Sequence, residues 1–194
     1  MKTYEIHIKS ICAMLHHGSQ AVGMDKPQTK KKGGQALMGD AEEWKKTIYY
    51  NPEVGVYLPA MVFEGCLKNA AKQFKITGRA TATKYVESGF FCIDEYLSFL
   101  VDGKPIKTLD DERIHIDKRS VKNPSTRGRN MRYRAKFDNW ESKFKAIVTA
   151  DDYIKHDLLE GIIEYAGNYI GVGDYRPRFG RFKLVSLEEI QDDV

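Results

Sequence analysis

Alternation of apolar and polar residues along three segments constrains the fold more than any other feature of this sequence. One side of the first segment carries Tyr4, Ile6, Ile8, Ser10, Cys12 and Met14, and the other side carries Glu5, His7 and Lys9. The same period recurs from Met131 to Phe137 and from Phe144 to Val148, with a turn over Asp138 to Glu141. A period of two is typical of strands with one buried face, so these segments predict a strand and a pair of partner strands.

Apolar residues at helical spacing lie between the predicted strands. They predict one helix from Met61 to Lys75 and a second from Tyr153 onward, ended by Gly167 or Gly171. Further strands are expected over Tyr96 to Val101, Arg113 to Val121 and Arg181 to Leu187. The core order is then strand, helix, strand, strand, helix, strand. This order predicts an α+β, ferredoxin-like (RRM-like) split βαββαβ fold.

The length of the chain fits one domain over residues 1–194. A long polar loop after the first strand, residues 16–51, and a basic, thumb-like hairpin over 102–130 are interpreted as insertions. With 42% hydrophobic and 30% charged residues the chain is expected to be globular. It contains no apolar run of about 20 residues and only three, widely spaced cysteines, so we expect a cytoplasmic protein with no membrane partner.

Charge is unevenly distributed along the chain, although 31 basic and 27 acidic residues leave a formal net charge of only +4. Nine basic residues opposed by one acid fill Arg113 to Lys136, and smaller basic groups occupy Lys26 to Lys32 and Arg176 to Lys183. Acidic residues gather in Asp94 to Glu112 and in the C-terminal tail. This segregation favours an anionic partner, although a solvated surface with uneven charge is the alternative.

The sharpest local motif is the glycine-rich stretch from Gly171 to Phe182, which reads GVGDYRPRFGRF. It follows a predicted helix and has Arg176 where a dinucleotide fingerprint requires its third glycine, so it is not such a fingerprint. Exposed backbone N–H groups beside Arg176, Arg178 and Arg181 would instead suit phosphates. The alternative is a glycine turn that carries solvated arginines.

These features resemble the RAMP superfamily (repeat-associated mysterious proteins), in particular the backbone subunits of CRISPR effector complexes. The resemblance covers the glycine-rich loop and the start of the first helix, from Tyr57 to Ala71, where Pro59, Gly65 and Leu67 match the family pattern. Lys68 stands where an arginine is usual, and Ala60, Met61 and Val62 replace small hydroxyl and glycine residues. At the level of element order the similarity spans most of the chain.

The resemblance implies a subunit that assembles head to tail along a single-stranded guide RNA, with other effector-complex subunits as further partners. Arg113 to Lys136 would form a protruding thumb. Single-stranded DNA is the alternative ligand. No cofactor is implied. The residues expected to contact nucleic acid are His16, His17, Lys26, Lys30, Lys31, Lys32, Lys68, Lys72, Arg119, Arg127, Arg129, Arg132, Arg134, Tyr175, Arg176, Arg178 and Arg181.

Three other functions compete with this interpretation. Some family relatives use an aspartate after the first strand to cleave RNA, and Asp25 stands in a loosely similar place, so a metal-assisted endoribonuclease is one alternative. A stand-alone single-stranded nucleic-acid-binding protein of a mobile element is another. The third is an interaction protein whose acidic and basic regions meet between copies. None of the histidines has the spacing of a metal site, and no local signature of a nucleophilic triad appears.

Overall fold

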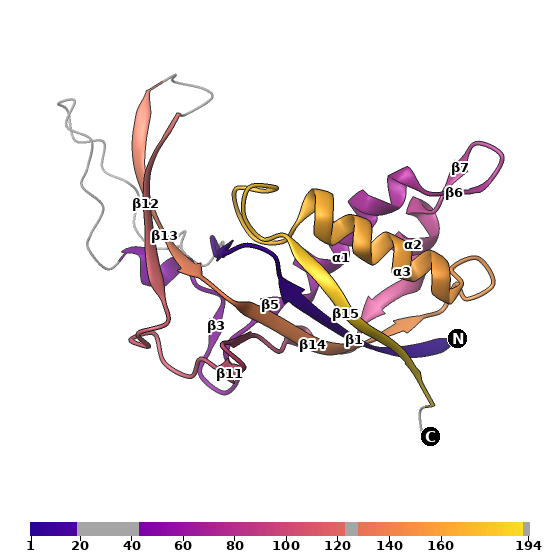
Figure 1. Ribbon diagram of the computed structural model, residues 1–194, viewed down its shortest axis with the longest axis horizontal. Coiled ribbons are helices and arrows are strands. Elements are labelled where there is room, and N and C mark those ends of the chain that lie inside the picture. The colour runs from indigo at the N-terminus through magenta and orange to yellow at the C-terminus, as the bar shows by residue number, and fades with distance from the viewer. Residues whose placement is uncertain (19–42, 123–127, 192–194) are drawn as a thin grey trace.

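The computed structural model, which describes residues 1–18, 43–122 and 128–191, is built on an antiparallel sheet (Figure 1). The strands of this sheet are β1 (Lys2–Ser10), β8 (Phe90–Cys92), β10 (Leu100–Val101), β11 (Lys104–Pro105), β14 (Trp140–Val148) and β15 (Phe182–Ile190). Their order is β11-β10-β14-β1-β15, and β8 pairs with the other end of β14. The final strand begins one residue later and ends three residues later than the sequence predicts.

The first strand confirms the predicted alternation. Ile6 of β1 lies opposite Phe144 of β14 and Leu187 of β15, and its side chain is fully buried with Tyr4 and Ile8. On the opposite face Glu5 forms an ion pair with Lys143 at 2.6 Å. One face of the sheet therefore packs into the core, and the other carries paired charges.

The helices cover the apolar face of the sheet (Figure 1). They are α1 (Ala60–Ala70), α2 (Thr83–Gly89) and α3 (His156–Tyr165), with the short helices η3 (Ala71–Gln73) and η4 (Ala166–Ile170). A further short helix, η2 (Glu43–Thr47), lies elsewhere and contacts β13 (Arg129–Phe137). Phe63 of α1 is fully buried, and its ring centroid lies 4.8 Å from that of Phe144 and 6.0 Å from that of Phe182. The first predicted helix stops earlier than expected, because Phe74 is already extended. The helix α2 was not predicted.

A second sheet projects from this body (Figure 1). It consists of β12 (His115–Lys122), β13 (Arg129–Phe137) and β2 (Met14–Leu15), with β13 in the middle. The strands β12 and β13 pair antiparallel from His115 and Lys136 at the base to Lys122 and Arg129 at the far end. This basic hairpin, which we call the thumb hairpin, covers most of the segment Arg113 to Lys136. The insertion expected over 102–130 has different bounds, because Lys104–Pro105 belongs to the central sheet as β11 and the hairpin extends to Phe137.

The predicted pairing of the strand from Met131 with the strand from Phe144 is wrong. Asn139 adopts a left-handed conformation (φ 47°) between β13 and β14, so the chain bends there and the two strands enter different sheets. Trp140 at the start of β14 is fully buried and lies opposite Val101 of β10. Burial of this indole fixes β14 in the central sheet, and β13 is left to pair with β12.

The strand predicted over Tyr96 to Val101 is broken into β9 (Tyr96–Leu97) and β10. The strand β9 pairs with β5 (Leu58–Pro59), which leads directly into α1. Two further pairs join β3 (Tyr50–Asn51) with β4 (Gly55–Val56), and β6 (Lys75–Thr77) with β7 (Ala80–Thr81). The described part of the chain is thus a mixed α/β structure with a multi-stranded antiparallel sheet and three α-helices. None of the helices described is both long and apolar enough to cross a membrane.

Candidate nucleic-acid interface

One face of the thumb hairpin gathers three of the predicted arginines. Arg119 of β12 lies opposite Arg132 of β13, and Asp117 lies opposite Arg134. Because side chains alternate across a strand, these four residues share one face. The other face carries Lys118, whose ammonium group lies 5.4 Å from the ring centroid of Tyr133.

The glycine-rich segment Gly171–Gly180, here called the glycine loop, packs against the base of this hairpin. The N–H of Asp174 donates to the carbonyl of Leu15 at 2.9 Å, and the N–H of Gly180 donates to that of Ala13 at 2.8 Å. Gly180 has φ +76°, and a Cβ there would lie 1.7 Å from the carbonyl oxygen of Val172. The glycine at this position is therefore required by close packing of the loop on itself.

The loop does not expose its backbone N–H groups in the way that the sequence motif suggests. Those of Gly171, Val172, Asp174, Tyr175, Phe179, Gly180 and Arg181 all donate to acceptors within the protein. Some of these hydrogen bonds close turns within the loop, and others join the loop to Ala13 and Leu15. Phosphate binding at this loop must therefore depend mainly on side chains.

A buried ion-pair network joins the hairpin to the loop. Arg134 is only 2% exposed, and its Nε lies 2.6 Å from Oδ2 of Asp174 in the loop. These two atoms lack hydrogen-bond geometry, so charge attraction holds the contact. Asp117 lies 3.7 Å from Arg134 and also accepts hydrogen bonds from Arg119 at 2.8 and 2.9 Å. Burial of this network makes the relative position of hairpin and loop costly to change.

Arg119 also packs on two aromatic rings of the loop. Its guanidinium carbon lies 5.3 Å from the ring centroid of Tyr175 and 4.9 Å from that of Phe179. The hydrogen bonds with Asp117 raise the pKa of Arg119. Arg119 and Arg134 therefore act within the protein as positioning residues, and Arg134 in particular is too buried to reach a phosphate in this conformation.

The other predicted arginines at this junction are accessible. Arg129 and Arg132 on the hairpin and Arg176 and Arg178 in the loop are exposed, and none forms an ion pair with a described residue. Arg176 donates a long hydrogen bond of 3.4 Å to the carbonyl of Gly171. These four arginines are the cations that the junction offers to an external anion.

A polar pocket of about 500 Å³ adjoins the loop. Its lining includes Tyr169 of η4, Tyr175, Arg176 and Asn69 at the end of α1. Tyr169 is 65% exposed and Tyr175 is 48% exposed, so both rings are accessible. The sequence interpretation missed Tyr169, although its place two residues before Gly171 was a usable signal.

The adjacent histidines His16 and His17 have opposite surroundings. His16 is fully buried, with its ring centroid 4.6 Å from that of Phe137 and 5.0 Å from that of Tyr49, and burial lowers its pKa to about 3. It cannot contact a surface ligand in this conformation, in contrast to the sequence prediction. His17 lies on the exposed side. Partial desolvation lowers the pKa of His17, and the neighbouring charges include Asp174 and Arg132.

The remaining described candidates are less well placed. Lys68 forms an ion pair with Glu87 of α2 and lies away from the glycine loop, beside a different pocket. Lys72 donates to Oδ1 of Asn69 at 2.8 Å, which places it at the edge of the polar pocket. Arg181 is partly buried, and its Nε has no hydrogen-bond partner among the described residues.

Several candidates lie outside the described residues. These are Asp25, Lys26, Lys30, Lys31, Lys32 and Arg127. Contacts of the basic residues with nucleic acid, and cleavage of RNA through Asp25, therefore stay predictions.

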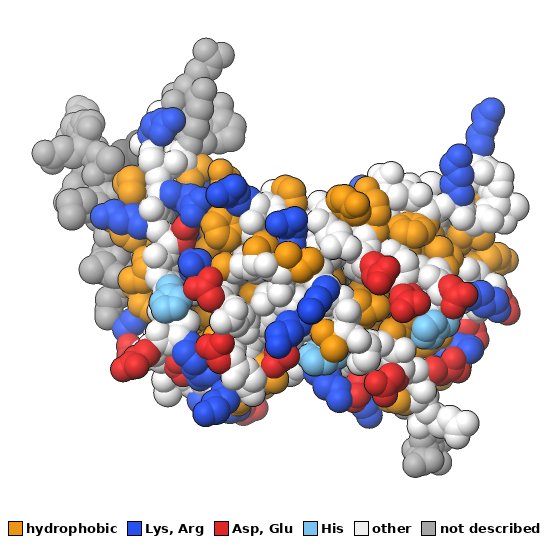
Figure 2. Space-filling view, viewed as in Figure 1, with side chains coloured by type: hydrophobic (Ala, Val, Ile, Leu, Met, Phe, Trp, Pro, Cys, Tyr) orange, Lys and Arg blue, Asp and Glu red, His pale blue; other side chains and the backbone are white. Residues whose placement is uncertain are grey.

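Charge is unevenly distributed on the surface as well as in the sequence. On the face shown in Figure 2, Lys and Arg side chains gather over the thumb hairpin and the neighbouring loop, and acidic side chains gather over α3. On the open face of the central sheet, charged side chains are paired with one another. His7 lies 3.1 Å from Glu141, and Glu5 forms an ion pair with Lys143. Unpaired arginines thus favour the junction over the sheet as the surface for an anion.

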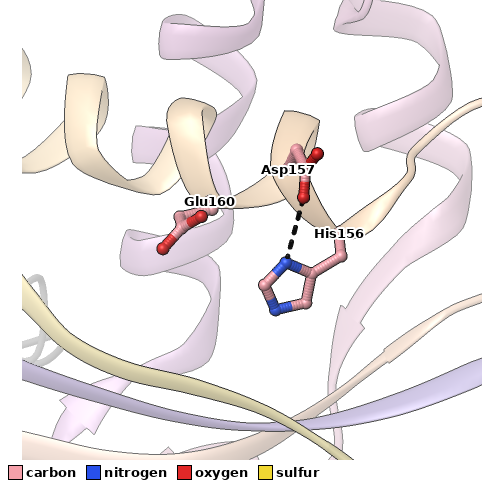
Figure 3. A group of neighbouring side chains, drawn as sticks. All are labelled: His156, Asp157 and Glu160. Carbon is pink, nitrogen blue, oxygen red and sulfur yellow. Dashed lines mark ion pairs between the residues drawn. The ribbon is translucent and has the colours of Figure 1, made fainter.

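One group of possible metal ligands occurs among the described residues, at the start of α3 (Figure 3). Nδ1 of His156 lies 3.5 Å from Oδ1 of Asp157, with Glu160 one turn further along the helix. Nε2 of His156 lies 3.2 Å from the carbonyl oxygen of Leu187. Asp157 is fully exposed and lies in the first turn of α3, where a negative charge stabilises the N-terminus of a helix. This role explains the acidic residue without a bound ion.

Comparison with known proteins adds no family to this description: no protein-family model matches the chain, and no curated protein matches it.

Proposed function

We propose that this protein binds single-stranded RNA through the phosphate backbone, at the junction of the thumb hairpin and the glycine loop. The observation that carries the proposal is the buried contact between Arg134 and Asp174, which holds an arginine-bearing strand face against an arginine-bearing loop. Each exposed arginine there can form bidentate contacts with phosphate oxygens and release counterions. Sequence-independent binding follows, because phosphates carry no base information.

The pocket beside the loop supports a single strand as the ligand. Tyr169 and Tyr175 present exposed rings next to Arg176, and unpaired bases stack on such rings. Bases in a duplex are already stacked and are not available for this contact. The combination of arginines with accessible tyrosines thus favours a single strand.

The finer fold assignment belongs to the same proposal. We interpret β1, α1, β8, β14, α3 and β15 as the split βαββαβ core of a ferredoxin-like domain. The strand order β15-β1-β14-β8, with all neighbours antiparallel, supports this interpretation. With the thumb hairpin as an insertion, the layout is that expected for a RAMP-type backbone subunit of a CRISPR-type ribonucleoprotein. Head-to-tail assembly along a guide RNA is part of this proposal.

Fluorescence anisotropy with a labelled, unstructured RNA of about 16 nucleotides tests the binding function. The protein is first freed of nucleic acid with nuclease and high salt. The variant Arg132→Ala/Arg178→Ala removes one exposed arginine from the hairpin and one from the loop. We expect its affinity to fall at least about tenfold at moderate salt.

The matched control is Lys75→Ala/Arg79→Ala, which removes two exposed cations from the β6–β7 hairpin at the other end of the molecule (Figure 1). It carries the same change in net charge. Equal losses in the two variants would show that affinity depends on net charge alone, and absence of binding by the wild-type protein would remove the proposal altogether.

A further inference from the structure

A second pocket, of about 450 Å³, lies on a part of the molecule that the proposed function does not use. It forms where β5 leads into α1 and where the chain passes from β8 to β9. Tyr57 and Tyr96 form its aromatic wall, with ring centroids 4.6 Å apart in an edge-to-face arrangement. We call it the tyrosine pocket.

Among the described residues, the charged side chains that line the tyrosine pocket are all acidic. They are Glu64 on α1 and the neighbours Asp94 and Glu95. Oε1 of Glu64 accepts the backbone N–H of Cys92 at 2.9 Å, which fixes this carboxylate at the wall. None of the three carboxylates forms an ion pair with a described residue, and no lysine or arginine lines the pocket within the described part of the chain. Uncompensated negative charge therefore surrounds the aromatic wall.

Burial and this negative charge together raise the pKa values of two groups at the pocket. Burial raises the pKa of the Tyr57 hydroxyl, and Tyr96 and Glu95 raise it further. Burial also raises the pKa of the Cys92 thiol, and Glu64 adds to this shift. The pocket thus disfavours anions, so a nucleic-acid phosphate is a poor occupant.

The rim of the pocket is apolar and exposed. Met61 is 76% exposed, Ile93 is 47% exposed, and Tyr96 is 37% exposed. Exposed apolar side chains such as these mark surfaces that a protein partner can bury, and arginine is a frequent central anchor of protein interfaces. A small hydrated cation would leave this rim in water. A planar guanidinium can stack on a tyrosine ring and pair with a carboxylate at the same time.

We propose that the tyrosine pocket binds the guanidinium group of an arginine side chain presented by a different, partner protein. Carboxylates of Glu64, Asp94 and Glu95 would pair with the cation, and Tyr57 and Tyr96 would contact its faces and stem. This inference does not rest on RNA binding, because the residues involved are separate from the hairpin and the glycine loop.

The test is a titration of the whole protein, labelled with ¹⁵N, with the peptide acetyl-Gly-Leu-Arg-Leu-Gly-amide. Amide chemical shifts report binding, and those from Cys92 to Tyr96 are expected to move in a saturable manner. A second peptide with citrulline in place of arginine keeps the shape and loses the charge. We expect its affinity to be at least about tenfold lower.

The variant Asp94→Asn/Glu95→Gln should weaken arginine-peptide binding by about tenfold or more and leave RNA affinity unchanged. The control Asp152→Asn/Glu164→Gln neutralises two exposed acids near α3 and should bind the peptide as the wild-type protein does. Failure of the arginine peptide to shift these amides at about 5 mM, or equal binding of the citrulline peptide, would overturn the proposal. Concentration-dependent shifts of the same amides without peptide would assign the pocket to a second copy and would also overturn it.

Discussion

Arg134 of β13 and Asp174 of the glycine loop lie 2.6 Å apart in a contact that leaves the arginine only 2% exposed. The two residues are 40 positions apart in the sequence, and their pairing connects the thumb hairpin to the segment between η4 and β15. A buried charge without its partner is strongly destabilising. The contact therefore determines where the exposed arginines of both elements lie.

Replacement of Arg134 by methionine should reduce the free energy of unfolding by about 3 to 5 kcal/mol, because Asp117 and Asp174 lose their shared cation. Urea denaturation followed by circular dichroism measures this loss. The control Lys143→Met breaks a pair on the open sheet face whose lysine is 54% exposed, and its unfolding curve should stay close to that of the wild type. Similar curves for the two variants would show that the Arg134 network contributes little.

Substitution of Gly180 by alanine should destabilise the protein by about 2 to 4 kcal/mol, because the new Cβ would overlap the carbonyl of Val172. Gly78→Ala is the matched control. Gly78 also has a positive φ, of 58°, but no atom of a described residue lies within 4 Å of the added Cβ, so the expected cost is about 1 kcal/mol. Thermal or urea unfolding of both variants measures the difference. Equal losses of stability in the two variants would mean that the positive φ alone requires glycine at position 180. Close packing of the loop would then contribute nothing to that requirement.

Tyr169→Ala should weaken binding of single-stranded RNA by about 1 to 3 kcal/mol, the range for loss of one stacked base. Stability should change little, since the ring is 65% exposed. Tyr153→Ala removes a ring that is 50% exposed and that stacks on Tyr85 outside the polar pocket, so RNA affinity should be retained. Anisotropy titrations compare the two, and unchanged affinity in Tyr169→Ala would exclude stacking at this position.

Stability should fall as the pH drops below 6.5, in part because of His16. Burial lowers the pKa of His16 from 6.5 to about 3, so between these values the unfolded chain binds a proton that the folded protein does not. This group alone should cost about 2 kcal/mol between pH 7 and pH 5. The variant His16→Gln stays neutral and should lose correspondingly less stability over that interval. Parallel pH profiles of urea-unfolding free energy for the two proteins would contradict the assignment.

The elements that alternation or helical spacing marks strongly could be predicted from the sequence. The strands β1 and β14 and the helix α3 are of this kind, because each buries one face against the core. The short strand β8 was missed because Phe90 to Cys92 is too brief to show a period. The bend at Asn139 decides which sheet receives β13, and no local pattern encodes that choice.

The candidate site was only partly predictable for a related reason. Residue type and spacing identify arginines, but the acids that bury some of them come from distant segments. Asp174 and Asp117 enclose Arg134, whereas Arg132, two residues earlier, stays exposed. His16 and His17 differ in the same way, because His16 packs against Phe137 and Tyr49 whereas the adjacent His17 stays exposed. Which cations remain available thus depends on tertiary contacts.

The salt dependence of RNA affinity tests the central claim most directly. Each phosphate contact that is lost should reduce the slope of log affinity against log salt by about 0.7 for a single strand. The variant Arg129→Ala/Arg132→Ala/Arg178→Ala should therefore bind with a slope smaller by about 2 than that of the wild type, and the Lys75→Ala/Arg79→Ala control should keep the wild-type slope. Parallel lines for the wild type and the triple variant would contradict an RNA contact at the junction of the thumb hairpin and the glycine loop.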